Sequence, residues 1–237
     1  MRHLKKAALA LVFAAASLGG LALGYPWLEP ARLLYDVHGI DVSHHQGEID
    51  WTAVAGDGVG FAFIKATEGG DFVDPRFAEN WKASAEAGVP RGAYHFFTQC
   101  RSGAVQAENF IRTVPKDAKA LPPVVDAEHM GPCRNSPQVN DVVKEIAVFL
   151  DRLKAHYGLR PLIYTTREFH DAYLTGRFAQ ERFWIRSLVI PPRFRQAQWT
   201  VWQYHNRGRR AGIKGPVDLN VLSDGPSELA ALLGLSR

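Results

Sequence analysis

The chain is poor in sulfur and lacks the common metal-binding and phosphate-binding patterns. Its 237 residues include two cysteines, Cys100 and Cys133, and two methionines. Two thiols alone are too few for a structural zinc site, and no H-x-x-x-H spacing supports a catalytic one. A glycine-rich phosphate loop is also missing. The sequence therefore predicts neither a metal ion nor a cofactor.

A marked excess of charge of one sign is missing as well. The chain has 28 Lys and Arg against 24 Asp and Glu, and Arg2, Lys5 and Lys6 supply most of that excess. The remainder is close to neutral, so nucleic acid is not a predicted partner. Between Arg177 and Lys214 there are nine basic residues and one acidic residue, Glu181. This segment is predicted to form a solvated face; a surface for an anionic polymer or lipid is the alternative.

The first 24 residues are predicted to direct export. After the basic start, Ala7 to Gly24 contains no charged residue, and about eighteen apolar residues fit either a signal peptide or an N-terminal membrane anchor. Cleavage before Tyr25 would free the protein into the periplasm or the extracellular space, whereas retention would attach it to a membrane.

Residues 25–38 are predicted to be a linker and 39–237 one domain. In an exported chain the two cysteines favour a disulfide.

Strand-like and helix-like segments alternate along this domain. Strands are expected at 39–42, 61–69, 91–97, 121–129, 161–165, 183–187, 200–204 and 217–220, and helices at 74–88, 102–115, 136–158 and 166–174. Asp74 is the expected N-cap of the first helix, with Pro75 at its first position. Alternation favours a parallel sheet, and eight strands favour closure. The sequence therefore predicts an α/β fold, an irregular TIM-like β/α barrel with few helices in its second half.

Two acidic residues, Asp126 and Glu128, end the strand in LPPVVDAEH. Positions i and i+2 of a strand share a face, with backbone origins roughly 6.6 Å apart. One carboxyl of such a pair is held protonated by burial and by its neighbour's charge, while the other stays ionised. A proton donor beside a charge stabiliser is the equipment for cleaving a glycosidic bond.

Polar groups are predicted at nearly every strand end, where a β/α barrel gathers its chemistry. They are Asp41, Glu68, Tyr94 with His95, Asp126 with Glu128, Tyr164, Gln203 with Tyr204, and Asp218. A rim of acids and aromatics suits a hydroxyl-rich sugar. His44 and His45 are not expected to bind a metal ion, because neighbours in a strand face opposite sides. They are expected instead to hydrogen-bond substrate or backbone.

The segments GIDVSHHQGEIDW, FAFIKATEG, GVPRGAYHFF, VVDAE, IYT, WQY and VDLN occur in an order that resembles the family-25 glycoside hydrolases. These are lysozymes that act as N-acetylmuramidases on peptidoglycan, and the resemblance covers residues 39–222. It implies hydrolysis of the β-1,4 bond between N-acetylmuramic acid and N-acetylglucosamine. Peptidoglycan glycan strands are then the expected partner, and a monomer the expected state.

The resemblance also implies roles for individual residues. Glu128 matches the general acid, and Asp126 matches the carboxylate that supports attack by the substrate's own acetamido group. Asp41 and Asp218 match two further acids of the pocket. The predicted substrate-binding set is Glu68, Tyr94, Tyr164, Trp202 and Gln203.

One segment departs from the family pattern. Where the family has W-[IV]-A-x-Y, this chain has Phe183 to Leu188, FWIRSL, which introduces Arg186. The departure leaves open a glycan-binding barrel without turnover. A second alternative is a hydrolase of another N-acetylated polysaccharide such as chitin, because a D-x-E strand end and an acetamido-assisted mechanism also occur in such enzymes.

Overall fold

The computed structural model describes residues 29–129, 139–188, 190–194 and 199–235. Its centre is a closed barrel in which eight strands follow the order β1-β9-β8-β7-β6-β5-β4-β2, and β2 pairs again with β1. These strands are β1 (His38–Val42), β2 (Phe61–Glu68), β4 (Arg91–Phe96), β5 (Val124–Ala127), β6 (Leu162–Thr166), β7 (Arg182–Arg186), β8 (Trp199–Gly208) and β9 (Val217–Leu222). A two-residue strand, β3 (Phe72–Val73), pairs with the end of β2. The predicted irregular α/β barrel is confirmed.

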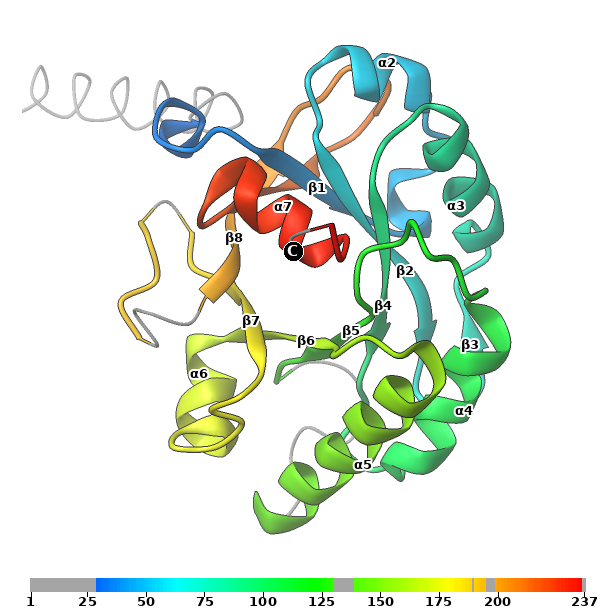
Figure 1. Ribbon diagram of the computed structural model, residues 1–237, viewed down its shortest axis with the longest axis vertical. Coiled ribbons are helices and arrows are strands. Elements are labelled where there is room, and N and C mark those ends of the chain that lie inside the picture. The colour runs from blue at the N-terminus through cyan, green and yellow to red at the C-terminus, as the bar shows by residue number, and fades with distance from the viewer. Residues whose placement is uncertain (1–28, 130–138, 189, 195–198, 236–237) are drawn as a thin grey trace, which may run out of the picture.

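Helices cover one side of the barrel (Figure 1). The described helical elements are η2 (Pro30–Leu33), η3 (His44–Gln46), α2 (Trp51–Gly56), α3 (Phe77–Glu86), α4 (Gly103–Thr113), α5 (Val139–Tyr157), α6 (Arg167–Phe169), η4 (His170–Leu174) and α7 (Gly225–Leu232). α3, α4 and α5 lie outside β2, β4 and β5, whereas β7 and β8 have no long helix against them among the described residues (Figure 1).

The direction of β9 differs from the parallel sheet that the alternation favours. Six neighbouring pairs of barrel strands are parallel, but β9 runs antiparallel to both β1 and β8. A parallel return from β8 needs a crossover of about a dozen residues or more, usually helical. The connection 209–216 contains no helix. The chain therefore turns back as a hairpin, and β9 brings its amino end to the rim where the other strands end.

Alternating side chains divide the strands between two cores. On β2, Phe61 and Phe63 belong to an inner core, while Ala62 and Ile64 belong to a larger outer core beneath the helices. The period of two along a strand explains the division. The inner core also includes Leu162, Trp184 and Val201, so packed side chains fill the barrel interior.

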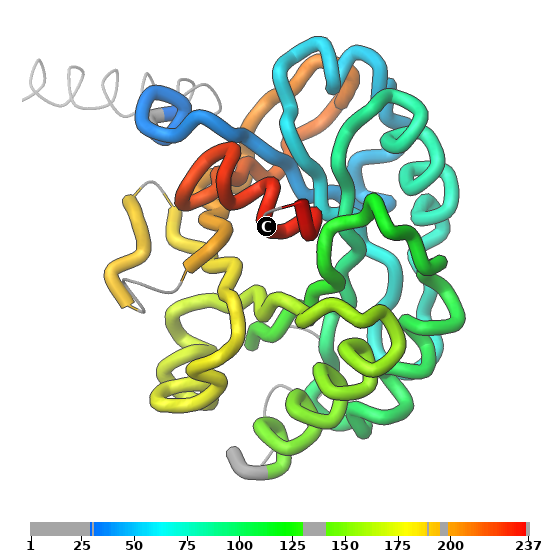
Figure 2. The backbone as a smooth tube through the Cα atoms, in the orientation of Figure 1, coloured from blue at the N-terminus to red at the C-terminus, as the bar shows by residue number. Residues whose placement is uncertain are grey.

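The C-terminal helix α7 closes one end of the barrel. It follows β9, and Leu229, Leu232 and Leu233 pack against the inner core. Figure 2 shows this part of the chain lying over the middle of the ring of strands. Because α7 follows the carboxyl end of the antiparallel strand, it lies at the amino ends of the parallel strands, opposite the expected site.

The starts of α4 and α3 differ in how well they match the expected helices. Ser102 caps α4 by accepting a hydrogen bond from the Val105 amide, 3.3 Å away. Asp74 is not the N-cap of α3, where Arg76 takes that place. Asp74 instead accepts hydrogen bonds from the amides of Arg76 and His44. The expected start of the third helix, Ser136, lies outside the described residues.

The segment before β1 packs against the barrel from residue 29 onward. Ala31 is fully buried. Arg210 donates two hydrogen bonds, of 2.7 and 2.8 Å, to the Glu29 carboxylate. Among the described residues no helix is both long and apolar enough to cross a membrane.

Replacing Leu232 with alanine tests whether α7 supports the barrel. Leu232 is 1% exposed, and a buried Leu→Ala change costs about 2–5 kcal/mol in the free energy of unfolding. Leu235→Ala is the control, because Leu235 is 70% exposed and should change stability by less than about 0.5 kcal/mol. Denaturant unfolding measures both variants. If Leu232→Ala lowered the free energy of unfolding no more than Leu235→Ala does, α7 would contribute little to the inner core.

Candidate active site

A pocket of about 380 Å³ opens at the carboxyl ends of the parallel strands. It is lined by Asp41, Val42, Ser43, His45, Gln46, Lys65, Tyr94, Phe96, Asp126, Glu128, Tyr164, Trp184, Arg186, Gln203, Asn206 and Asp218. All four predicted acids are therefore brought together, with three of the five predicted substrate-binding residues.

The inward face of each strand supplies this pocket. On β7, Trp184 reaches into the barrel, and its ring stacks on Phe63 with 4.8 Å between centroids. Arg186, two residues later, shares that face and lines the rim. The pocket thus has an aromatic floor and a charged upper wall.

The structure does not bring Trp202 into the pocket. Gln203 faces inward on β8, so its neighbour Trp202 faces outward into the outer core. The Trp202 indole N–H donates to the Ser187 carbonyl oxygen at 2.6 Å, and its ring packs edge-on against Tyr35. Trp202 therefore supports the barrel wall.

Glu68 lies at the rim but does not line the pocket. Its carboxylate accepts a hydrogen bond from the Lys65 ammonium at 2.7 Å. Lys65 itself is 9% exposed and lines the pocket as an inward residue of β2. Lys65 was not predicted as a pocket residue. The alternation that places Phe61 and Phe63 inside the barrel places Lys65, two residues later, on the same inward face.

Asp41 and Asp218 face each other across the antiparallel pair β1–β9. Asp41 Oδ2 accepts hydrogen bonds from Gln203 Nε2 at 2.9 Å and from Asn220 Nδ2 at 2.7 Å. Burial raises the pKa of Asp41 to about 6. Burial and the Asp41 charge raise the pKa of Asp218 to about 8. Asp218 therefore holds a proton at neutral pH and donates it toward Asp41.

Asp126 and Glu128 form the second acidic pair, and each is 8% exposed. Burial, together with the neighbouring Glu128 charge, raises the pKa of Asp126 well above its usual value. Burial also raises the pKa of Glu128, while the nearby Arg186 charge opposes that rise. Both pKa shifts favour the protonated carboxyl, which is the form that a general acid requires.

Two polar contacts orient the aromatic and amide side chains of the wall. The Tyr164 hydroxyl donates to Gln203 Oε1 at 3.0 Å, which leaves Gln203 Nε2 for Asp41. The indole N–H of Trp184 donates to Asn220 Oδ1 at 2.8 Å. Asn220 was not predicted as a site residue, and through these contacts it ties the pocket floor to Asp41.

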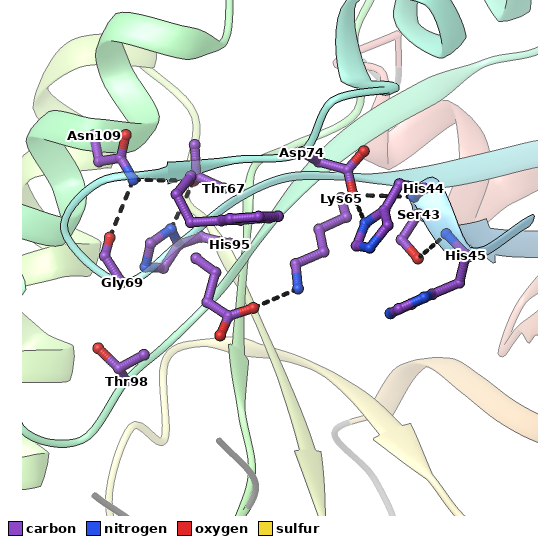
Figure 3. Close-up of polar contacts among 12 residues, drawn as sticks. Ser43, His44, His45, Lys65, Thr67, Gly69, Asp74, His95, Thr98 and Asn109 are labelled. Atoms are coloured by element: carbon purple, nitrogen blue, oxygen red, sulfur yellow. Dashed lines mark hydrogen bonds and ion pairs between the residues drawn. The ribbon is translucent and has the colours of Figure 1, made fainter. Parts of the chain in front are cut away.

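The two adjacent histidines have different environments. His44 Nδ1 lies 2.8 Å from Asp74 Oδ2 (Figure 3), and the backbone amide of His44 binds the same carboxylate. His45 lines the pocket. Asp74 therefore fixes the loop after β1, which positions His45 at the rim.

His95 lies outside the pocket, although its neighbour Tyr94 lines it. Its ring is fully buried, with Thr67 Oγ1 2.7 Å away on one side (Figure 3). On the other side Gln106 Oε1 lies 3.1 Å from the ring. Burial lowers the pKa of His95 to about 3, so the ring is neutral and ties β4 to α4.

The expected disulfide stays a prediction. Cys100 is not a free thiol, but Cys133 lies outside the described residues.

Comparison with known proteins agrees with this geometry. Residues 40–213 match the model of the family described as Glycosyl hydrolases family 25. The chain is 38% identical over 205 residues to YegX of Escherichia coli K12, covering 84% of this chain and 74% of that protein. It is 36% identical over 210 residues to Lysozyme M1 of Streptomyces globisporus, covering 83% of this chain and 71% of that protein.

A solved structure shares the fold. The family 25 glycosyl hydrolase of Bacillus anthracis superposes with a TM-score of 0.79 and 41% sequence identity, covering 83% of this chain and 93% of that one.

The acidic pocket should make folding stability depend on pH. Asp218 has a pKa of about 8 in the folded chain, whereas the ordinary pKa of an aspartate is 3.8. Between these values the folded state keeps a proton that the unfolded state has lost. The free energy of unfolding therefore falls as the pH rises through this window, by at most about 1.4 kcal/mol per pH unit for one group. Asp218→Asn should flatten the decline in urea unfolding measured from pH 4 to pH 8. Identical slopes for the variant and the parent would contradict the assignment.

Proposed function

The chain belongs to glycosyl hydrolases family 25, and from this premise we propose that it is a muramidase in which Glu128 is the general acid. The bond cleaved is the β-1,4 linkage between N-acetylmuramic acid and N-acetylglucosamine in peptidoglycan. The observation that carries the proposal is the Asp126–Glu128 pair at the mouth of the barrel, where burial raises the pKa of both carboxyls and so favours the protonated form.

Glu128 transfers its proton to the bridging oxygen as the bond to the anomeric carbon breaks. The acetamido oxygen of the N-acetylmuramic acid attacks its own anomeric carbon and forms a cyclic intermediate. Water then opens the ring and returns a proton to Glu128. This is the substrate-assisted exception to the scheme with two acting carboxylates.

Asp126 supports the attack by binding the acetamido N–H. Its Oδ1 atom is buried and has no hydrogen-bond partner among the described residues, so an acceptor is available for that group. A hydrogen bond donated to a carboxylate favours its ionised form. Substrate binding at Asp126 therefore moves the shared proton toward Glu128, where the reaction needs it.

The remaining pocket residues hold the sugar. The Asp41–Asp218 pair and Gln203 present acceptors and donors suited to hydroxyl groups, and Tyr94 and Trp184 provide apolar surface for a pyranose ring. Among the predicted residues, Trp202 is not part of this proposal, because it lies on the other face of β8.

The substitution Glu128→Gln tests the general acid. It keeps the shape of the side chain but removes the transferable proton, so we expect a fall in kcat of about 100-fold or more. Purified peptidoglycan is digested, and new N-acetylmuramic acid reducing ends are counted. Glu86→Gln, on the exposed end of α3, is the matched control and should retain full activity. Unchanged activity of Glu128→Gln would remove Glu128 from this role.

Glycan binding without turnover is the second candidate, and Arg186 is the observation that favours it. The guanidinium lies 3.5 Å from Glu128 Oε2 and favours the ionised carboxylate, which weakens a proton donor. Retention of the glycan by the unmodified protein, with no new reducing ends after long incubation, would support this alternative.

We also propose that the protein is exported, because residues 1–24 combine a basic start with an uncharged apolar run. Mass spectrometry of the mature protein should find an N-terminus at or near Tyr25. An intact Met1 in the membrane fraction would instead show that the segment is retained as an anchor.

A further inference from the structure

A second pocket, of about 500 Å³, adjoins the catalytic pocket on the other side of Glu128. It is lined by Glu128, His129, Thr166, Arg167, Glu168, Arg186, Ser187 and Leu188. Glu128 and Arg186 line both pockets. A polymer that extends from one pocket into the other must therefore pass these two side chains.

The position of Glu128 decides which part of the substrate enters the second pocket. A general acid lies beside the bond that breaks, between the sugar undergoing attack and the departing sugar. Asp41, Asp126 and Asp218 surround the first of these in the catalytic pocket. The second pocket is then on the departing side, which carries the continuing glycan strand.

Arg186 is the cation best placed to meet a substrate group there. Its guanidinium lies 3.5 Å from Glu128 Oε2 and near the Tyr164 hydroxyl. The Arg186 side chain is 35% exposed. A guanidinium has five N–H donors in a planar fork that matches a carboxylate. The other arginine of the pocket, Arg167, is already paired with Asp171 at 2.6 Å.

We propose that Arg186 determines specificity by binding a carboxylate of the glycan strand in the second pocket. This inference rests on the proposed muramidase function. The departing sugar beside the cleaved bond is N-acetylglucosamine, which has no carboxylate, so the recognised group belongs to the next muramic acid along the departing strand. It has two sources: the lactyl group of a muramic acid without peptide, and the peptide carried by that group. Chitin lacks both, so the contact selects against a neutral polymer.

The same contact bears on the acid itself. Titratable and charged groups face Glu128 from three directions. The catalytic pocket contributes Asp41, Lys65, Asp126 and Asp218, and the wall contributes Tyr164 and Arg186. The second pocket contributes His129, Arg167 and Glu168. Among these groups, Arg186 is the largest influence opposing the rise in the pKa of Glu128. A substrate carboxylate that engages the guanidinium reduces this influence, and Glu128 is then more readily protonated in the complex than in the free enzyme.

The test uses three substrates with the full-length protein: peptide-bearing strands, peptide-free strands with free lactyl carboxylates, and peptide-free strands whose carboxylates are converted to methylamides. The variants are Arg186→Ala, Arg186→Lys and Arg152→Ala, an exposed control on α5. We expect Arg186→Ala to lower kcat/KM by about 10- to 100-fold on strands with the recognised carboxylate, and by less than about twofold on the methylamide strands. Arg186→Lys should recover part of the loss.

The outcomes separate the two carboxylate sources and the two proposals. A loss confined to peptide-free strands assigns the lactyl carboxylate, and a loss confined to peptide-bearing strands assigns the peptide. Equal effects of Arg186→Ala on charged and methylamide strands would overturn the inference, while leaving the muramidase function intact.

A binding measurement keeps the test decisive if turnover is absent. The dissociation constants of the charged and methylamide strands are measured for Glu128→Gln and for Glu128→Gln combined with Arg186→Ala. A preference of Glu128→Gln for the charged strands that disappears in the double variant supports the inference. Absence of that preference in Glu128→Gln overturns it.

Discussion

The organisation of the site depends on placing four carboxyl groups in one buried pocket. Removing ionised carboxyls from water is costly, and mutual repulsion adds to that cost. The structure limits it by retaining protons, by donating two amide hydrogen bonds to Asp41, and by placing Lys65 and Arg186 in the pocket wall. In the proposed mechanism, the groups that keep these protons lie where a sugar oxygen would arrive.

The barrel produces this arrangement through two simple rules. Alternation along each strand separates the inward polar set from the outward apolar set, so Asp126 faces the pocket while Val125 packs in the outer core. The reversed direction of β9 then adds Asp218 to the rim from the amino side of a strand and places the buried Asn220 beneath it. A parallel ninth strand would have placed those two residues near the end that α7 covers.

Much of this site could be predicted from the residues at strand ends. Which of those residues point into the barrel and which point outward could not always be predicted. The paired acids at 126 and 128 show their shared face through spacing alone. In VWQY, however, Val201, Trp202 and Tyr204 are all buried, and a strand buried on both faces shows no clear alternation. The sequence therefore does not show that Trp202 and Gln203 face opposite sides of the barrel wall. The sequence does not identify Lys65 as a pocket residue, because one cation in an apolar strand does not reveal its partners. The direction of β9 is also hard to predict, because it depends on a loop whose sequence carries no helical signal.

The reversed strand also sets the order in which the enzyme can become competent during its synthesis. Asn220 lies 179 positions after Asp41, and Gln203 lies 162 positions after it, so the amides that stabilise the first acid emerge from the ribosome late. Contacts of such long sequence separation form slowly, because loop-closure entropy is lost before they stabilise the fold. A nascent chain in which every strand before β9 has been synthesised still lacks a closed barrel and the acid at Asp218. Hydrolytic capacity thus appears in a single late step.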